Sequence, residues 1–309
     1  MKKRAVVFAG QGAQFVGMGK DLAAAHPECA ELFTRASAVL GYDLLQLCAE
    51  GPIGEITKSD KCQPAIFVTS AACYTALKKL TPELQVSGFA GLSLGEWTAL
   101  WAAGVLSFED TVKVLQARGK AMQEACNERP GGMVSVMGLA LPALEKVCAE
   151  AGVQMANINS AEQIVLSGEK DKIAAAEKLA QAAGAKKTVV LPVAGAFHSP
   201  LMAPAAAKLD HILAGMTFQK PAVPVRANVT AKPHGEPVEI KAVMVRQVTS
   251  SVQWVATIEG FKQDGVTEYI ECGPGKVLAG LIKRIDKDAS TVSIQDVPTL
   301  DKAVAALKA

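Results

Sequence analysis

The segment 86–95, VSGFAGLSLG, decides how this chain is expected to fold. Its first part, Val86–Leu92, reads as a buried strand, and the following Gly95–Ala103 has the composition of a helix. Between them lies GLSLG at 91–95, a G-x-S-x-G pattern whose two glycines permit a sharp turn. Strand, tight turn and helix in this order predict a parallel sheet with crossover helices.

Patterns of apolar and small residues on both sides of this segment predict further elements. We expect strands at 5–9, 225–228 and 268–271, with helices at 18–40, 64–77, 108–125, 200–215, 240–249 and 274–284. Residues from about 130 to 195 follow the order strand-helix-strand-strand-helix-strand, which is typical of the split ferredoxin-like motif. The predicted fold class is α/β. A large α/β-hydrolase-like parallel-sheet subdomain at 1–128 and 197–309 would carry an inserted small ferredoxin-like subdomain at 129–196.

Composition argues against several classes of protein. Half of the 309 residues are hydrophobic, which is enough for a sizeable core. The formal net charge is only +2 and no long basic run occurs, so no nucleic-acid partner is expected. The apolar stretch behind Lys2, Lys3 and Arg4 is too short for a signal peptide. No run of about 18 apolar residues occurs, so we expect no membrane span.

The cysteines indicate a reducing compartment. There are seven, an odd and scattered set without a C-x-x-C pair. A disulfide framework or a zinc site is therefore not expected, and a cytoplasmic location fits best. Most of these cysteines are expected to be small core residues.

Ser93 is the candidate nucleophile. In the predicted strand–turn–helix context its hydroxyl would be lifted out of the sheet, beside a helix N-terminus that favours developing negative charge. The Leu94 N–H could form half of an oxyanion hole. The glycine-rich turn at 10–14 does not match a dinucleotide-binding motif, because Phe15 stands where the third glycine is needed. A free backbone N–H of this turn could instead supply the other half of the oxyanion hole. The alternative is a plain helix-capping serine between glycines.

A serine hydroxyl needs a base, and His198 is the best of the four histidines. It lies in a turn of small residues directly after a predicted strand, where α/β proteins commonly build their sites. No acid to complete a triad is evident. Gln247, near the end of a predicted helix, could instead offer its unpaired backbone carbonyl to the His198 ring. The alternative is a structural histidine.

Arg118 lies inside an apolar stripe of the predicted helix at 108–125, where a charge is unexpected. The stripe contains Leu115 and Met122, three residues before it and four after it. A desolvated guanidinium needs a partner. That partner could be a protein carboxylate, in an ordinary structural ion pair, or the carboxylate of a ligand, which arginine binds in a bidentate manner.

Seven short motifs, spread in order over nearly the whole chain, carry a resemblance to a known family. They are FAGQGAQ at 8–14, QP at 63–64, GLSLGE at 91–96, QARG at 116–119, GAFHSP at 195–200, NVTA at 228–231 and GPGK at 273–276. Together they resemble the malonyl-CoA:acyl carrier protein transacylases and the related acyltransferase domains of polyketide synthases.

The resemblance implies a role for each matching position. Ser93 would be the nucleophile and His198 its base. Roles of support and binding are implied for further residues: Gln11 and Leu94 as oxyanion-hole N–H donors, Gln247 to hold His198, Arg118 for the malonyl carboxylate, and Gln63, Met122 and Asn228 to line the pocket. Phe197 would leave little room for an α-methyl group.

The resemblance also implies the partners. Malonyl-CoA and an acyl carrier protein are expected, in fatty-acid synthesis and through a ping-pong mechanism. No metal or redox cofactor is needed. A monomer is expected, and Lys276, Lys283, Arg284 or the pair at 186–187 could dock an acidic carrier.

The chain departs from the family pattern at four positions, and none of these removes a chemical role. They are Ala9 for proline, Leu92 for histidine, Ala194 for serine and Ser251 for proline. Three alternatives to a malonyl transferase remain open at this point. They are a serine hydrolase such as a thioesterase, a non-catalytic scaffold, and a polyketide-type acyltransferase of other specificity, against which the free-standing length argues.

Overall fold

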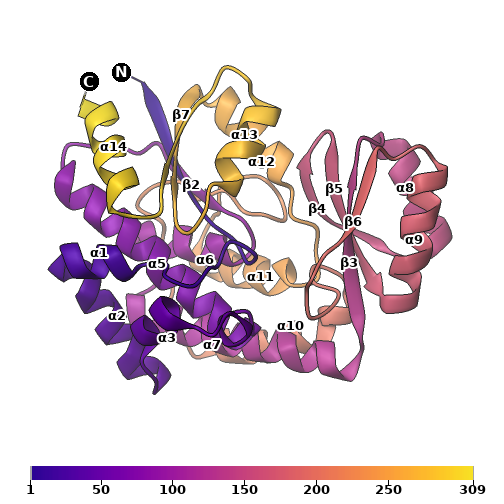
Figure 1. The fold of residues 1–309 in the computed structure, drawn as a ribbon, viewed down its shortest axis with the longest axis horizontal. Helices are drawn as coiled ribbons and strands as arrows, with labels where there is room; N and C mark the ends of the chain where they lie inside the picture. The colour runs from indigo at the N-terminus through magenta and orange to yellow at the C-terminus, as the bar shows by residue number, and fades with distance from the viewer. Residues whose placement is uncertain (1, 309) are drawn as a thin grey trace.

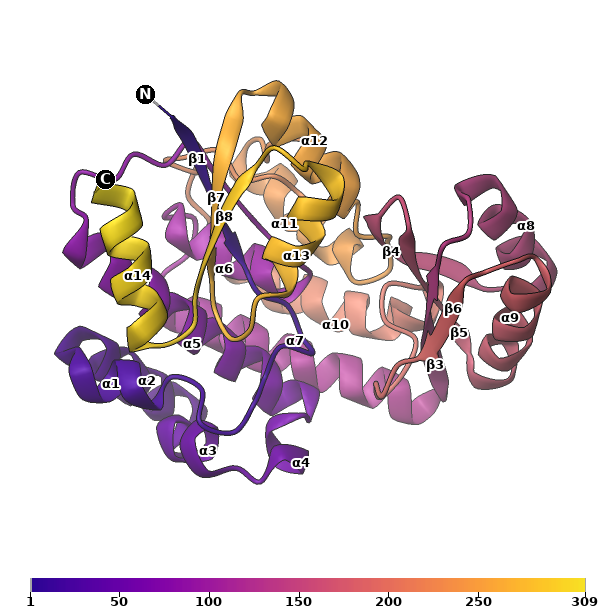
Figure 2. The same cartoon turned by 45° about the horizontal axis from the view of Figure 1, so that its top comes forward.

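The computed structural model describes residues 2–308, and its larger part is built on a parallel sheet (Figure 1). The strand order is β2-β1-β7-β8. Its strands are β1 (Lys3–Phe8), β2 (Gly88–Gly91), β7 (Val266–Cys272) and β8 (Ser290–Ile294). Figure 2 shows β1, β7 and β8 side by side, with the chain termini at the same end of the molecule.

Helices cover both faces of this sheet, as a buried parallel sheet requires. On β1, Ala5 and Val7 face a cluster that includes α12 and α13, whereas Val6 and Phe8 join the larger core around α5. The helices of this part are α1 (Lys20–Ala25), α2 (Pro27–Leu40), α3 (Leu44–Glu50), α4 (Ile53–Ile56), α5 (Ser59–Leu80), α6 (Leu94–Ala102), α7 (Phe108–Glu128), α10 (Ala203–Ala214), α11 (Pro237–Gln247), α12 (Trp254–Gln263), α13 (Val277–Ile285) and α14 (Val297–Lys308), with a short 3₁₀ turn at Pro200–Met202.

The smaller part is an antiparallel sheet of order β4-β5-β3-β6 with two helices on one face, visible on the right of Figure 1. Its elements are β3 (Gly131–Met137), α8 (Leu141–Ala151), β4 (Gln154–Ser160), β5 (Gln163–Glu169), α9 (Lys170–Ala182) and β6 (Lys187–Val190). This is the ferredoxin-like order. The α/β fold class with a small ferredoxin-like subdomain is confirmed, while the bounds 129–196 stay a prediction.

The two parts are joined by backbone hydrogen bonds as well as by the chain. Val252, in the segment after α11, donates its N–H to Ala156 O at 2.8 Å, and its own carbonyl accepts from Ile158 N at 2.9 Å. The edge strand β4 of the small sheet is therefore tied to the segment that follows Gln247.

Several expected elements differ from the structure. The helix expected at 18–40 is two helices, because His26 adopts the extended backbone that a residue before proline prefers. The strand expected at 225–228 is wrong, since that segment makes only isolated bridges, from Val225 to Phe89 and from Arg226 to Pro233. Local sequence patterns did not indicate α3, α4, α12, β8 or α14. Within residues 2–308, no helix is both long and apolar enough to cross a bilayer.

Candidate active site

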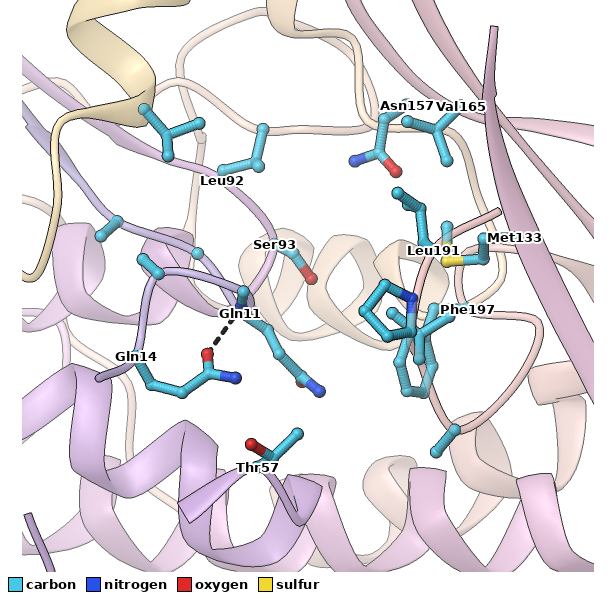
Figure 3. A pocket seen from close by; sticks show the side chains of 18 of the residues that line it. Gln11, Gln14, Thr57, Leu92, Ser93, Met133, Asn157, Val165, Leu191 and Phe197 are labelled. Carbon is cyan, nitrogen blue, oxygen red and sulfur yellow. Dashed lines mark hydrogen bonds between the residues drawn. The ribbon is translucent and has the colours of Figure 1, made fainter. Parts of the chain in front are cut away.

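Ser93 sits at a sharp turn between β2 and α6. Its backbone has φ 54° and ψ −105°, a conformation rare for a residue with a side chain. The flanking glycines are required by contact: a Cβ on Gly91 would lie 2.1 Å from Gly95, and one on Gly95 would lie 2.3 Å from Phe8 O. Figure 3 shows the Ser93 hydroxyl pointing into a cavity. The turn expected from G-x-S-x-G is therefore present.

His198 is hydrogen-bonded to this hydroxyl. The Ser93 Oγ and His198 Nε2 lie 2.8 Å apart. The other ring nitrogen, Nδ1, lies 2.9 Å from Gln247 O and 3.1 Å from Ser250 O. Carbonyls only accept, so Nδ1 carries the proton and Nε2 is left to accept from Ser93. Ser250, which follows the end of α11 at Gln247 by three residues, was not predicted as a partner of His198.

The ring of His198 is held in its neutral form. Burial, and next the positive charge of Arg118, lower the pKa of His198 to about 4, against the opposing effect of its hydrogen bonds to Gln247 and Ser250. An imidazole that is neutral at neutral pH can accept the serine proton. Among residues 2–308 no carboxylate contacts the His198 ring, and its orienting groups are the two backbone carbonyls.

Arg118 is buried beside Ser93, with 1% of its surface exposed. Its Nη2 lies 3.1 Å from Ser93 Oγ and 3.0 Å from Gln247 Oε1, and its Nη1 lies 2.7 Å from Gln63 Oε1. Among residues 2–308 no carboxylate forms an ion pair with it, and its Nε has no hydrogen-bond partner. Burial lowers the pKa of Arg118 to about 10, opposed by the charge of Glu96, so the guanidinium stays charged at neutral pH.

Three of the four backbone N–H groups at the start of α6 already have hydrogen-bond partners. The Ser93 N–H donates to Asn228 Oδ1 at 2.7 Å, the Gly95 N–H to Leu92 O and the Glu96 N–H to Ser93 O. Leu94 is the first helical residue, whose N–H has no partner within the helix.

Gln11 faces the same cavity from the turn after β1 (Figure 3). The dashed line in that figure is the 2.8 Å bond from the Gly12 N–H to Gln14 Oε1, which fixes the turn. The resemblance assigns the Gln11 and Leu94 N–H groups to an oxyanion hole. Of these two residues, Gln11 lines the cavity and Leu94 is fully buried beneath it.

Three residues that the resemblance assigns to the pocket lie in different surroundings. Met122 lines the cavity. Gln63 and Asn228 are fully buried and, like Arg118, are not among the residues that line it. Gln63 instead holds Arg118, and the Asn228 side-chain amide donates to Gly91 O at 2.7 Å, under the turn that carries Ser93.

A buried carboxylate behind the site was also missed. Glu96 Oε1 accepts from His234 Nε2 at 2.7 Å, and both side chains are inaccessible. Glu96 Oε2 accepts from the Asn228 N–H at 3.1 Å and from Gln247 Nε2 at 2.5 Å. The sequence feature that could have indicated Glu96 is its position among apolar residues in the helix after Ser93. Its partner His234 read only as part of a proline- and glycine-containing loop.

The cavity has a volume of about 860 Å³, within the usual range for small-molecule sites. One wall comes from the large subdomain, with Gln11, Gln14 and Ser93. The facing wall comes from the small sheet and the segment behind it, where Figure 3 shows Met133 and Phe197. The site therefore lies where the two parts of the chain meet. Within residues 2–308, no group of three or more histidine, cysteine or acidic side chains is arranged to hold a metal.

Comparisons with known proteins agree with one another. The family model described as "Acyl transferase domain" matches residues 5–307. The malonyl CoA-acyl carrier protein transacylase of Haemophilus influenzae is 43% identical over 305 residues, which are 97% of this chain and 98% of the relative. The corresponding protein of Escherichia coli is 42% identical over 303 residues, covering 97% of each chain.

Two solved structures are also similar to this chain over nearly its whole length. An acyl carrier protein S-malonyltransferase from Vibrio cholerae is 40% identical, with a TM-score of 0.94 over 97% of this chain and 99% of that one. A type II PKS acyl-carrier protein has been solved in complex with its malonyl-transacylase. In that structure the matching chain is 38% identical, with a TM-score of 0.94 over 98% of this chain and 99% of that one.

Proposed function

Because this chain belongs to the acyl transferase family and is an acyltransferase, we propose that it moves malonyl groups from malonyl-CoA to the phosphopantetheine thiol of an acyl carrier protein, supplying fatty-acid synthesis. The observation that carries the proposal is Arg118. A buried guanidinium without a protein carboxylate, 3.1 Å from a nucleophilic hydroxyl, is matched to an acyl group that ends in a carboxylate.

In the first half-reaction, His198 Nε2 takes the Ser93 proton while Oγ attacks the thioester carbon. The resulting oxyanion receives N–H groups from Gln11 and Leu94, each worth about 3–4 kcal/mol in the transition state. The carbon–sulfur bond then breaks, and the departing CoA thiolate takes the proton from His198. A malonyl ester on Ser93 remains, with its carboxylate on Arg118.

The second half-reaction runs in reverse with another thiol. The phosphopantetheine thiol of the carrier protein gives its proton to His198 and attacks the ester carbon of the malonyl-serine. The bond to Ser93 Oγ breaks, and the serine recovers its proton from His198. No metal or redox cofactor has a step in this scheme. Phe197, which lines the cavity, would restrict the space beside the acyl α-carbon.

The decisive experiment is intact mass spectrometry of the pure protein after incubation with malonyl-CoA, in parallel with acetyl-CoA. We expect a malonyl adduct that maps to Ser93, with little acetyl adduct. Steady CoA release without an adduct would favour a hydrolase. Neither adduct nor release would reject this substrate.

The pH dependence of malonyl loading follows from the lowered pKa of His198, about 4. The base acts when unprotonated, so kcat/KM for loading should be level from about pH 8 down to about pH 5 and decline only near pH 4. Rapid-quench loading with circular dichroism at each pH measures this and controls for unfolding. A decline centred near pH 6.5, the ordinary value for histidine, contradicts the assignment.

Docking of an acidic carrier protein is proposed for the basic residues beside the cavity. Lys276 precedes Val277, which lines the cavity mouth with 55% of its surface exposed, and Arg284 donates to the lining residue Gln163 at 2.8 Å. Added salt should therefore raise the KM for the carrier several-fold and leave its kcat unchanged. A KM independent of salt in steady-state transfer assays would argue for an apolar docking surface.

The proposal also includes a cytoplasmic monomer. Six of the seven cysteine side chains are buried as free thiols, which supports the proposed reducing compartment. Light scattering on the purified protein tests the monomer, and a dimer mass would contradict it.

A further inference from the structure

Two buried opposite charges in this site are separated by a single amide. Arg118 is 1% exposed and Glu96 is inaccessible, yet they form no ion pair. The Gln247 side chain lies between them. Its Nε2 donates to Glu96 Oε2 at 2.5 Å, and its Oε1 accepts from Arg118 Nη2 at 3.0 Å.

The two charges specify which way this amide points. An ionised carboxylate only accepts hydrogen bonds and a guanidinium only donates them. Gln247 can satisfy both neighbours only with its NH₂ toward Glu96 and its oxygen toward Arg118. The reversed amide would bring two donors together at Arg118 and two acceptors together at Glu96, both without access to water.

Glu96 is also linked to Ser93, through hydrogen bonds to Asn228 and Gln247. Asn228, whose N–H donates to Glu96, accepts the Ser93 N–H on its side chain. Gln247 Nε2 also donates to Ser93 O at 3.0 Å. On the far side His234 Nε2 donates to the second carboxylate oxygen at 2.7 Å, which holds Glu96 in place. One carboxylate thus supports both the serine backbone and Arg118, each through a single residue.

The separation also has an electrostatic consequence. The negative charge of Glu96 offsets part of the cost of burying Arg118, since attraction persists across one residue in a dry interior. A carboxylate in direct contact would instead occupy the guanidinium and compete with a ligand. The direct partners of Arg118 are a serine hydroxyl and two amide oxygens, all neutral, which leave its charge available.

We propose that Glu96, held by His234, is a positioning residue that orients the Gln247 amide and balances Arg118 from a distance, so that Arg118 keeps its charge for the acyl carboxylate. This inference rests on the proposed function, because it concerns the selection of a carboxylate-bearing acyl group.

The test is the Glu96→Gln variant, assayed for kcat and KM of acyl loading from malonyl-CoA and from acetyl-CoA. The side chain keeps its size and loses its charge. We expect kcat/KM for malonyl-CoA to fall by about tenfold to a hundredfold, mainly through KM, as on loss of a charged hydrogen-bonding partner. Acetyl loading should fall by about threefold at most, because the acetyl group makes no use of the Arg118 charge.

Two further variants make the outcome decisive. Glu268→Gln removes another buried carboxylate, which lies on β7, pairs with Arg4 of β1 and has no contact with Glu96, Gln247 or Arg118. This variant should leave the malonyl-to-acetyl ratio as in the wild type. Glu96→Asp keeps the charge and should retain most of the malonyl preference. If Glu96→Gln does not fold, Glu96→Asp carries the test, and loss of preference with the charge retained overturns the proposal.

Equal losses for the two acyl groups in Glu96→Gln, or no loss, would show a merely structural carboxylate. Failure of the proposed function gives a different result, since the wild-type protein would then form no malonyl adduct in the parallel reaction.

Discussion

Replacing Ser93 by alanine is expected to abolish the malonyl adduct and to lower malonyl transfer by at least about 10⁴-fold, as for other serine nucleophiles. The physical reason is that this hydroxyl is the group bonded to the candidate base, with 2.8 Å between Oγ and His198 Nε2. Intact mass spectrometry after incubation with malonyl-CoA measures the adduct, and a coupled assay measures transfer.

A serine close by provides the matched control. Ser250 contacts His198 only through its backbone carbonyl, so Ser250→Ala keeps that contact and should load malonyl groups as the wild type does. An undiminished adduct in Ser93→Ala, mapped to another residue, would overturn the assignment of the nucleophile.

Replacing Arg118 by alanine should change the specificity of the enzyme rather than abolish its chemistry. Malonyl loading is expected to fall by about a hundredfold to a thousandfold, the effect of removing one partner of a buried charge pair. Acetyl loading should fall far less, because Ser93 and His198 keep their mutual contact. The measurement is the ratio of kcat/KM values for malonyl-CoA and acetyl-CoA.

Arg118→Lys separates charge from shape. Lysine keeps the positive charge but lacks the planar fork that binds a carboxylate through two hydrogen bonds. It should recover part of the malonyl preference. If Arg118→Ala reduces malonyl and acetyl loading by equal factors, Arg118 serves the structure of the site and the malonyl assignment loses its support.

Backbone strain in residues 2–308 gathers around this site. The non-glycine residues with positive φ are Ser93 at 54°, His198 at 57° and Ala231 at 57°. Ala231 belongs to the turn that begins near Asn228, as its N–H donates to Ala227 O. Such conformations cost about 1–3 kcal/mol each and persist only where many surrounding contacts hold the residue in place. They are typical of functional sites, where the geometry must be maintained.

Local sequence determined much of the chemistry of this site. The turn that carries Ser93 was predictable because glycines at 91 and 95 and a flanking strand and helix are features of adjacent residues. His198 was selected by the small residues around it. Arg118 was found because its position in a helical repeat places it on the apolar face, and the structure buries it there. The strand-helix order of the small subdomain was also visible in local patterns.

What joins these pieces depends on contacts between distant parts of the chain. Glu96 and His234 are 138 residues apart, and Ser93 and His198 are 105 apart. Such pairings depend on how α6, the segment after β6 and α11 pack together, as in the hydrogen bond from Gln247 Nε2 to Ser93 O. Periodicity describes only which face of an element is buried, not which other element will cover it.

By itself, the sequence determined that a serine turn, a candidate base and an arginine on an apolar helix face exist, because each is recognised from neighbouring residues. Only the tertiary structure decided that Arg118 has neutral partners, that Ser250 shares the His198 ring and that Glu96 lies one amide behind. Those are relations between side chains that meet only when the chain has folded.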